Sequence, residues 1–342
     1  MILRCRQVEL RLRHTFRLAR GASDSRRNLL IEVEEDGLVG YGEAAPIARY
    51  RQDAASAARA VEAMVAALED PRAFDAELRR VAIPDQPAAA AALDMALRDL
   101  AAKRMGAPLY QVLGLDPGTL PETSFTIGLD TPEGAVAKVK EAEHFGVLKI
   151  KLGSPGDREM LEAVRGATRQ RLRVDANEGW SLDTALENLR WLEELGVEMV
   201  EQPLPEGREE EMRRLRRKSP LPVFADESVH RAQDIPRLAE AFDGINIKLM
   251  KCGGLGEALR MIAVARAHGL KVMLGCMVES SLAITAAAHI APLVDYLDLD
   301  GNLLVVNDPF EGVAEECGRL RLPEGPGLGV RKRMDELEPE RP

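Results

Sequence analysis

LKIKLG at residues 148–153 is the first of five short apolar runs that each carry charged residues near their carboxyl end. In chain order, the charged residues of these runs are Lys149 and Lys151, Asp175, Glu201, Asp226 and Lys248. From Lys151 onward the intervals between them are 24, 26, 25 and 22 residues. Each interval is about the length of one strand and one return helix. This spacing predicts a (β/α) barrel whose strand ends bring these side chains together around one open mouth.

The alternation of strands and helices extends to either side of these runs. The candidate strands are SFTIG at 124–128, LKIKLG at 148–153, LRVDAN at 172–177, MVEQP at 199–203, PVFADES at 222–228, INIKLM at 245–250, KVMLGCM at 271–277 and YLDLDG at 296–301. Charged amphipathic stretches, with glycine or proline at their ends, separate most of them. The sequence therefore predicts an α/β fold built on a modified TIM barrel of eight strands and seven helices.

The segment before the barrel has a different pattern. Residues 1–45 alternate apolar and polar side chains with a period of two, which is typical of strands. Two helices are predicted next, at 54–69 and 87–106, and Gly106 followed by Pro108 provides a stop for the second. Strands followed by helices predict a small α+β domain.

Composition excludes several classes of protein. The chain has 342 residues, 46% hydrophobic and 30% charged, and a net charge of −10, which argues against a nucleic-acid surface. Its four cysteines, at positions 5, 252, 276 and 317, have no metal-ligand or disulfide spacing. The first residues lack the apolar core of a signal peptide, and charges interrupt every apolar run before it could span a bilayer. We therefore expect a cytoplasmic protein without a membrane or nucleic-acid partner.

Three carboxylates on consecutive strand ends predict a metal site. Asp175, Glu201 and Asp226 offer only oxygen donors, which suits Mg²⁺, with Mn²⁺ as the alternative ion. The competing interpretation is that each acid caps the helix that follows its strand. Three such acids on successive units favour the metal site. Asn177 lies two residues after Asp175, on the same strand face, and is expected to support the site.

Two groups of lysines flank the three acids. Lys149 and Lys151 point the same way on one strand, and the neighbouring Lys149 and the metal are expected to disfavour protonation of Lys151 and so to suit it to act as a working base. Lys248 is the expected partner on the far side, with Lys251 as the competing candidate. With the substrate carboxylate held by the metal, amines on opposite sides imply that one removes the α-proton and the other returns a proton to the opposite face of the α-carbon. The product is an inverted stereocentre, formed by a 1,1-proton transfer through an enediolate.

These motifs resemble those of the enolase superfamily, and most closely its muconate-cycloisomerase-like subgroup. The shared motifs are K-x-K in LKIKLG, D-x-N in VDAN, the glutamate of VEQP, the aspartate of ADES, the lysine of INIKLMKCGG, VGYGEAAP at 39–46, the helical segment 91–114 and GCMVESSLAITAAAHIA at 275–291. The resemblance implies an α+β capping domain at 1–118, a (β/α)₇β barrel at 119–310 and a tail at 311–342 that returns to the cap. It also implies that Lys151 and Lys248 are catalytic and that Mg²⁺ binds the three acids.

The eighth strand narrows the resemblance to one group of enzymes. Asp298 and Asp300 in YLDLDG point the same way and would pair with a substrate ammonium. The alternative is an ordinary turn formed by D-x-D-G. The pair is similar to the D-x-D of the dipeptide epimerases, where it binds the amino terminus of a dipeptide. The residues that this resemblance implies for substrate contact are Thr126, Lys149, Cys276, Val278, Asp298 and Asp300.

The segment FRLARGASDSRR at 16–27 looks like the mobile cap loop that closes over substrate in these relatives. In relatives selective for glutamate, an arginine in this loop meets the side-chain carboxylate. Counting from Phe16, that position falls on Gly21 here, beside Arg20. Glutamate and apolar side chains therefore remain equally open, and Arg26 and Arg27 are interpreted first as ordinary surface charge.

The sequence as a whole predicts a Mg²⁺-dependent epimerase, an isomerase that inverts the α-carbon of the C-terminal residue of a dipeptide. The substrate would be L-Ala-L-Xaa, with L-Ala-L-Glu among the candidates, and a homo-oligomer is a candidate assembly. The alternatives on the same scaffold are a cycloisomerase, an o-succinylbenzoate synthase or an N-acylamino acid racemase. A barrel that binds a small ligand without catalysis is the remaining alternative.

Overall fold

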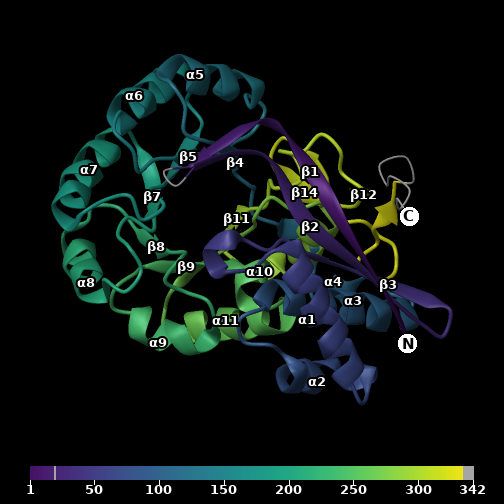
Figure 1. The fold of residues 1–342 in the computed structure, drawn as a ribbon. Coiled ribbons are helices and arrows are strands. Elements are labelled where there is room, and N and C mark those ends of the chain that lie inside the picture. Colours follow the sequence, from purple (N-terminus) through teal and green to yellow (C-terminus); the bar gives the residue numbers. More distant parts are fainter. Residues whose placement is uncertain (19–20, 334–342) are drawn as a thin grey trace.

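The structure is a computed structural model that describes residues 1–18 and 21–333. It contains an eight-stranded parallel sheet surrounded by helices and, beside it, a three-stranded antiparallel sheet with helices of its own (Figure 1). The predicted TIM-type barrel with an α+β capping domain is confirmed. Within the described residues, no helix combines the length and the apolar character needed to cross a membrane.

The cap begins with the three-stranded sheet, in the order β1-β2-β3. Its elements are β1 (Ile2–Leu18), β2 (Gly21–Glu35), β3 (Leu38–Ala44), η1 (Ala48–Tyr50), α1 (Ala54–Ala67), η2 (Pro71–Ala73), α2 (Phe74–Val81), α3 (Pro87–Arg104), α4 (Leu109–Val112) and η3 (Pro117–Thr119). The two predicted helices start where expected and end two residues early. Leu68 is already extended after α1, and Gly106 has a φ of +67° after α3.

Helix α3 is buried along almost its whole length because it packs closely on the cap sheet. Its first half is rich in alanine, and β3 has glycines where the two elements meet. A Cβ on Gly42 would lie 2.0 Å from the carbonyl oxygen of Ala92, and a Cβ on Gly40 would lie 2.1 Å from that of Ala96. Small residues on both surfaces therefore permit the contact.

The barrel strands run in the order β11-β10-β9-β8-β7-β6-β5-β4. They are β4 (Phe125–Ile127), β5 (Val147–Lys151), β6 (Arg171–Asp175), β7 (Val197–Glu201), β8 (Val223–Ala225), β9 (Gly244–Lys248), β10 (Lys271–Gly275) and β11 (Tyr296–Asp298). A parallel bridge between Thr123 and Leu297 joins the two ends of the sheet. All eight predicted strands are present.

Helices fill the seven connections between these strands. They are α5 (Pro132–Glu141), α6 (Asp157–Ala167), α7 (Leu182–Glu194), α8 (Glu209–Lys218), η4 (Ala232–Asp234) with α9 (Ile235–Leu238), α10 (Leu249–Cys252) with α11 (Leu255–Ala267), and α12 (Ser281–Ala288) with η5 (Ala291–Leu293). Figure 1 shows most of them forming the outer ring of the barrel. Serine or threonine side chains cap α5, α7 and α12, which fixes where these helices begin.

The strand register aligns the candidate residues. Lys151 pairs with Asp175, and Asp175 pairs with Glu201. Asp226 directly follows β8, and Lys248 ends β9. Because the strands are parallel, these side chains form one layer at the carboxyl end of the barrel. Below them, Phe224, Tyr296 and two methionines form a separate apolar cluster.

The cap reaches the barrel through the long β1–β2 hairpin, which crosses toward β5 in Figure 1. His14 Nε2 lies 2.7 Å from the carboxylate of Glu141 at the end of α5. The backbone N–H of Leu129 donates to the carbonyl of Arg17 over 3.1 Å. The hairpin therefore lies against the connection between β4 and α5.

The chain after the barrel forms two short antiparallel pairs. They are β12 (Phe310–Glu311) with β15 (Arg331–Lys332), and β13 (Ala314–Glu316) with β14 (Arg319–Arg321). Gly327 exchanges backbone hydrogen bonds with Ala107 and Leu109, next to α3 and α4 of the cap. The expected domain limits at residues 118 and 310 stay predictions.

Candidate active site

Three buried carboxylates form the centre of the barrel mouth. Asp175 ends β6, Glu201 ends β7 and Asp226 follows β8. Each offers one oxygen, and these three oxygens all lie within 4.8 Å of one another. The fold thus brings together the three acids that the sequence pattern predicts as metal ligands.

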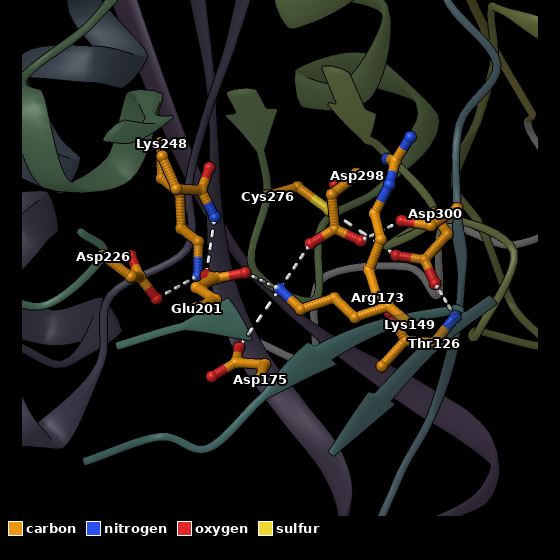
Figure 2. Close-up of polar contacts among 12 residues, drawn as sticks. Thr126, Lys149, Arg173, Asp175, Glu201, Asp226, Lys248, Cys276, Asp298 and Asp300 are labelled. Atoms are coloured by element: carbon orange, nitrogen blue, oxygen red, sulfur yellow. Dashed lines mark hydrogen bonds and ion pairs between the residues drawn. The ribbon is translucent and has the colours of Figure 1, made fainter. Parts of the chain in front are cut away.

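Lys149 and Lys151 approach the acids from β5. The Lys149 ammonium lies 2.7 Å from Glu201 Oε2 and 3.1 Å from Asp175 Oδ2. Figure 2 shows it at the centre of the cluster, where it also donates to Asp298 over 2.8 Å. The Lys151 ammonium donates to Asp175 Oδ2 over 2.6 Å. Both lysines line the cavity above the site.

Lys248 and Lys251 both contact Asp226 but differ in position. Lys248 donates to Asp226 Oδ2 over 2.8 Å and lines the cavity (Figure 2). Lys251 donates to Asp226 Oδ1 over 2.5 Å and to three backbone carbonyls, those of Asp226, Val229 and Asn246. It is not among the residues that line the cavity. Lys251 therefore holds Asp226 from behind, and Lys248 is the lysine able to meet a substrate.

The carboxylates differ in how easily they ionise. Burial raises the pKa of Glu201 to about 7, and the Asp175 carboxylate adds to this effect. Burial also acts on Asp175, but the Lys151 and Lys149 ammonium groups outweigh it and hold the pKa of Asp175 below its usual range. Lys248 and Lys251 overcome burial in the same way and keep the pKa of Asp226 well below its usual range. A divalent cation among the three would relieve their mutual repulsion.

The donor set fits Mg²⁺. Three carboxylate oxygens converge, and no histidine or thiolate of the described part of the chain joins them in the cluster. Hard oxygen ligands of this kind suit Mg²⁺, which also keeps positions for water or substrate oxygens. Asn177 lines the cavity beside them, and its buried Oδ1 has no hydrogen-bond partner within residues 1–18 and 21–333. The backbone N–H of Asn177 donates to Asp175 Oδ1 over 2.9 Å, in line with the supporting position expected for this residue.

Two supporting residues were not anticipated from the sequence. The Asn246 amide donates to Glu201 Oε1 over 2.8 Å. Gln202 Oε1 accepts the backbone N–H groups of Asp226 and Ser228, which fixes the turn after β8. A signal for Asn246 was present, since it lies two residues before Lys248 on the same strand face.

Of the predicted substrate residues, Asp298 on β11 and Thr126 on β4 lie away from the strands that carry the acids, whereas Lys149 on β5 lies among the acids. Asp298 accepts from Ser124 Oγ over 2.7 Å as well as from Lys149. Asp300 accepts the backbone N–H of Thr126 over 2.6 Å. Burial raises the pKa of Asp300 to about 6, with Asp298 adding to the effect. Figure 2 shows the two aspartates beside each other.

Cys276 and Val278 belong to the loop that follows β10. The Cys276 thiol donates to the carbonyl of Asp298 over 3.2 Å. The Val278 carbonyl accepts from the side chain of Asn28 in the cap. Cys276 and Val278 both line the cavity, so the fold gathers all six predicted substrate residues at one opening. Their roles in substrate contact stay predictions.

The cavity has a volume of about 840 Å³, and cap and barrel both form its walls. The cap contributes η1 and the first half of β2, within residues 21–28. Arg49 of η1 also pairs with Glu178 of the barrel over 2.6 Å. Arg26 is partly buried in this wall, unlike the surface charge that the sequence suggested. It makes no ion pair with a carboxylate in the described chain, and burial lowers the pKa of its guanidinium. Gly21 is exposed, and Arg20 lies outside the described residues.

Two family models match the chain. The mandelate racemase/muconate lactonizing enzyme N-terminal domain matches residues 2–114, and the enolase C-terminal domain-like family matches residues 133–336. Together they cover most of the cap and the barrel.

Similar proteins extend over nearly the whole chain. An L-Ala-D/L-Glu epimerase of Bacteroides thetaiotaomicron is 44% identical over 329 residues, which cover 95% of this chain and 86% of that protein. A hydrophobic dipeptide epimerase of a Flavobacteria bacterium strain is 41% identical over an alignment of 344 positions, which covers 95% of this chain and 96% of that protein. Among solved structures, a dipeptide epimerase from Cytophaga hutchinsonii, complexed with Mg and D-Ala-L-Val, superposes with a TM-score of 0.93 at 29% identity. That match covers 97% of this chain and 96% of the other.

Proposed function

The chain belongs to the mandelate racemase/muconate lactonizing enzyme family, and from this premise we propose which of its residues carry the reaction. Its function is that of a Mg²⁺-dependent dipeptide epimerase, an isomerase that inverts the α-carbon of the C-terminal residue of a dipeptide. The observation that carries the residue roles is the strand order. Lys151 on β5 and Lys248 on β9 flank the three acids on β6, β7 and β8 from opposite sides.

Lys151 and Lys248 exchange the proton of the α-carbon. The neutral amine on one side takes the proton, the C–H bond breaks, and its electron pair moves into the carboxylate to give an enediolate. The ammonium on the other side then donates its own proton to the opposite face. The electron pair returns to carbon, and the configuration is inverted. In the reverse direction the two lysines exchange roles.

The carboxylates of Asp175, Glu201 and Asp226 hold the Mg²⁺. When bound there, Mg²⁺ stabilises the negative charge that develops on the substrate carboxylate. Asn246 and Gln202 keep Glu201 and Asp226 in position through the hydrogen bonds described above. Lys149 lies within 3.1 Å of two of these acids and contributes a fixed positive charge beside them.

Asp298 and Asp300 receive the ammonium group of the dipeptide. They lie on β11 and just after it, across the barrel from Asp226 in the strand order. Asp298 already forms an ion pair with Lys149, so Asp300 is the carboxylate of the two that remains for the substrate ammonium. A substrate ammonium would favour ionisation of Asp300, whose pKa is otherwise raised to about 6. Cycloisomerase and succinylbenzoate synthase substrates bring no amine to this position.

Arg26 favours an acidic side chain at the second residue of the dipeptide. It is a partly buried cation in the cavity wall that no described carboxylate neutralises. An unpaired guanidinium in such a wall gains a charge-assisted bidentate interaction from a carboxylate ligand. This assigns L-Ala-L-Glu and related acidic dipeptides ahead of the apolar ones.

A deuterium experiment tests the function. We expect incubation of L-Ala-L-Glu with the protein and Mg²⁺ in D₂O to give one deuterium at the α-carbon of glutamate, together with the D-epimer. Mass spectrometry and chiral chromatography measure both. A cycloisomerase or lyase would leave a broad dipeptide library unlabelled. An N-acylamino acid racemase would label N-acyl amino acids in preference to dipeptides with a free amine.

We also propose that the enzyme is cytoplasmic. All four cysteines are free thiols, which suits the reducing cytoplasm. The lack of a nucleic-acid or membrane partner and the homo-oligomer stay predictions.

A further inference from the structure

A buried carboxylate joins the cap to the barrel beside the cavity. Glu43 of β3 is fully buried, and its Oε1 accepts from the Asn28 amide over 2.7 Å and from the Ser280 N–H over 3.0 Å. The Ser280 hydroxyl donates to Oε2 over 2.5 Å. Within residues 1–18 and 21–333, no lysine, arginine or histidine forms an ion pair with Glu43. All its described partners are neutral, and they come from both parts of the fold.

Asn28 provides a second contact between the cap and the barrel. Its side-chain amide also donates to the carbonyl of Val278 over 3.0 Å, so its two N–H bonds are divided between the cap and the barrel loop. Asn28 lies on β2 two residues after Arg26, on the same strand face, and both line the cavity. Val278 also packs with Leu10 of β1 in a small apolar cluster. The cap therefore contacts the loop at residues 276–280 by hydrogen bonds and by packing.

The loop at 276–280 also contacts the eighth barrel strand and the residues that follow it. The Cys276 thiol donates to the Asp298 carbonyl, and the loop runs so close to Gly301 that a Cβ there would lie 2.3 Å from the carbonyl oxygen of Met277. A displacement of the loop would therefore displace the segment that carries Asp298 and Asp300. Cys276, Met277 and Val278 themselves form part of the cavity wall.

We propose that Asn28 and Glu43 are positioning residues through which the cap sets the 276–280 loop and the Asp298–Asp300 segment for dipeptide binding. The inference rests on the proposed function, because it concerns the substrate side of the same site. Neither residue touches the reacting carbon in this account. They act through the backbone of Val278 and Ser280.

The cost of this arrangement argues for such a role. A buried carboxylate without a cation is expensive, and burial raises the pKa of Glu43. The N-terminus of α12 already has a cap in the Ser280 side chain, which accepts from the N–H of Leu282. Helix capping alone therefore does not require Glu43.

The cap provides a control in Asp94 of α3, which differs from Glu43 in that it also pairs with Arg98 over 2.9 Å. This carboxylate is also buried, and it accepts the N–H of Leu255 at the start of the barrel helix α11 over 2.6 Å. Like Glu43, it fastens the cap to the beginning of a barrel helix. Asp94 and Leu255 do not line the cavity. A general loosening of the contact between cap and barrel would affect both positions, whereas positioning of the substrate loop would involve only Asn28 and Glu43.

The test compares Asn28→Ala, Glu43→Gln and Asp94→Asn with the unaltered enzyme. We expect the first two to raise KM for L-Ala-L-Glu about tenfold and to leave kcat within about twofold, because a displaced wall weakens substrate and transition state alike. Hydrogen–deuterium exchange of the Ser280 and Leu282 amides should be faster by about the same factor in Asn28→Ala. Asp94→Asn should leave KM and these amides unchanged.

Unchanged KM and unchanged amide exchange in folded Asn28→Ala would overturn the proposal. So would an equal rise of KM in Asp94→Asn, which would indicate general loosening. Glu43→Gln keeps the side-chain volume and serves as the test if Asn28→Ala does not fold. An inactive unaltered enzyme would instead contradict the epimerase assignment, and the amide exchange would still test the link.

Discussion

Two clusters of buried charge, one at the barrel mouth and one on helix α3 of the cap, differ in what their carboxylates bind. Asp99 of α3 accepts two backbone N–H groups, those of Tyr41 and Leu328, as well as the Lys103 ammonium. At the mouth, Asp175 and Asp226 bind mainly lysine ammonium groups. The α3 acids therefore fasten separate parts of the chain together, whereas the mouth acids mainly balance lysine charges beside a cavity, with neutral donors from Asn177 and Asn246 in support.

This difference separates structural charge from functional charge better than burial does. Asp99 and Asp175 are both fully buried. The oxygens of Asp99 are occupied by fixed backbone donors from β3 and the C-terminal segment. The mouth concentrates carboxylate oxygens within 4.8 Å of each other, an arrangement that costs stability unless a cation uses it. A carboxylate that joins backbone groups of distant segments away from any cavity thus indicates a structural role, and carboxylates that crowd together beside a cavity indicate a site.

The largest effect that would test this comparison comes from Glu201→Gln. We expect kcat/KM for epimerisation to fall by about a thousandfold, since one oxygen of the cation site is lost. The midpoint of thermal unfolding without Mg²⁺ should stay the same or rise, because one of three repelling carboxylates is removed. Steady-state kinetics and calorimetry measure the two effects. A strongly destabilised but active variant would place Glu201 with the structural acids.

The next effect concerns His289, which joins α12 to the segments around it. Its Nδ1 accepts the N–H of Tyr110 over 3.1 Å, its Nε2 lies 3.3 Å from the carbonyl of Leu328, and burial lowers its pKa to about 4. Between pH 4 and 6.5 the unfolded chain therefore binds a proton that the folded chain does not, so stability is lost as the pH falls through this window.

We expect this histidine to account for up to about 3 kcal/mol of that loss, from a pKa difference of roughly 2.5 units. His289→Gln should flatten the dependence of the free energy of unfolding on pH between 6.5 and 4, as measured by urea denaturation. The same slope in both proteins would contradict a neutral buried His289.

Asp99→Asn tests the structural side of the comparison. We expect the free energy of unfolding to fall by about 2 kcal/mol. The asparagine side chain has one acceptor oxygen in place of two, so it cannot accept from all three groups that donate to Asp99. Values of kcat and KM should remain within about twofold of the unaltered enzyme. A selective loss of activity without loss of stability would mean that the α3 cluster is not merely structural.

The smallest effect is expected for Arg26→Ala. Loss of the guanidinium should lower kcat/KM for L-Ala-L-Glu about tenfold and leave L-Ala-L-Leu nearly unchanged, because only the acidic side chain loses a charged partner. Parallel assays of the two dipeptides measure the ratio. Equal losses for both dipeptides would show that Arg26 shapes the wall without selecting the side chain.

The barrel and its polar ring could be predicted from the sequence because both are local patterns. Each strand is a short apolar run, and each charged residue near its end reaches the mouth through the geometry common to all parallel strands. Lys248 could be preferred over Lys251 for the same reason, since it falls inside the strand. The cavity-lining position of Lys248 agrees with that preference.

The contacts between cap and barrel could not be predicted in this way. Glu43 and Ser280 are 237 residues apart, and no periodicity relates them. The sequence indicates surface charge for Arg26, but its partial burial follows from its place in a cavity wall that cap and barrel form together, which no local pattern reveals. Gln202 belongs to the VEQP motif at the end of β7, but the backbone N–H that it accepts lies in the turn after β8. Its supporting role therefore depends on a contact between two different strand ends.

The central claim is that one lysine serves each face of the α-carbon, and exchange in D₂O with Lys151→Ala and Lys248→Ala tests it most directly. We expect both variants to lose epimerisation and to keep α-proton exchange with one epimer each, Lys151→Ala with one and Lys248→Ala with the other. Interconversion of the epimers by either variant, or exchange of the same epimer by both, would contradict the claim.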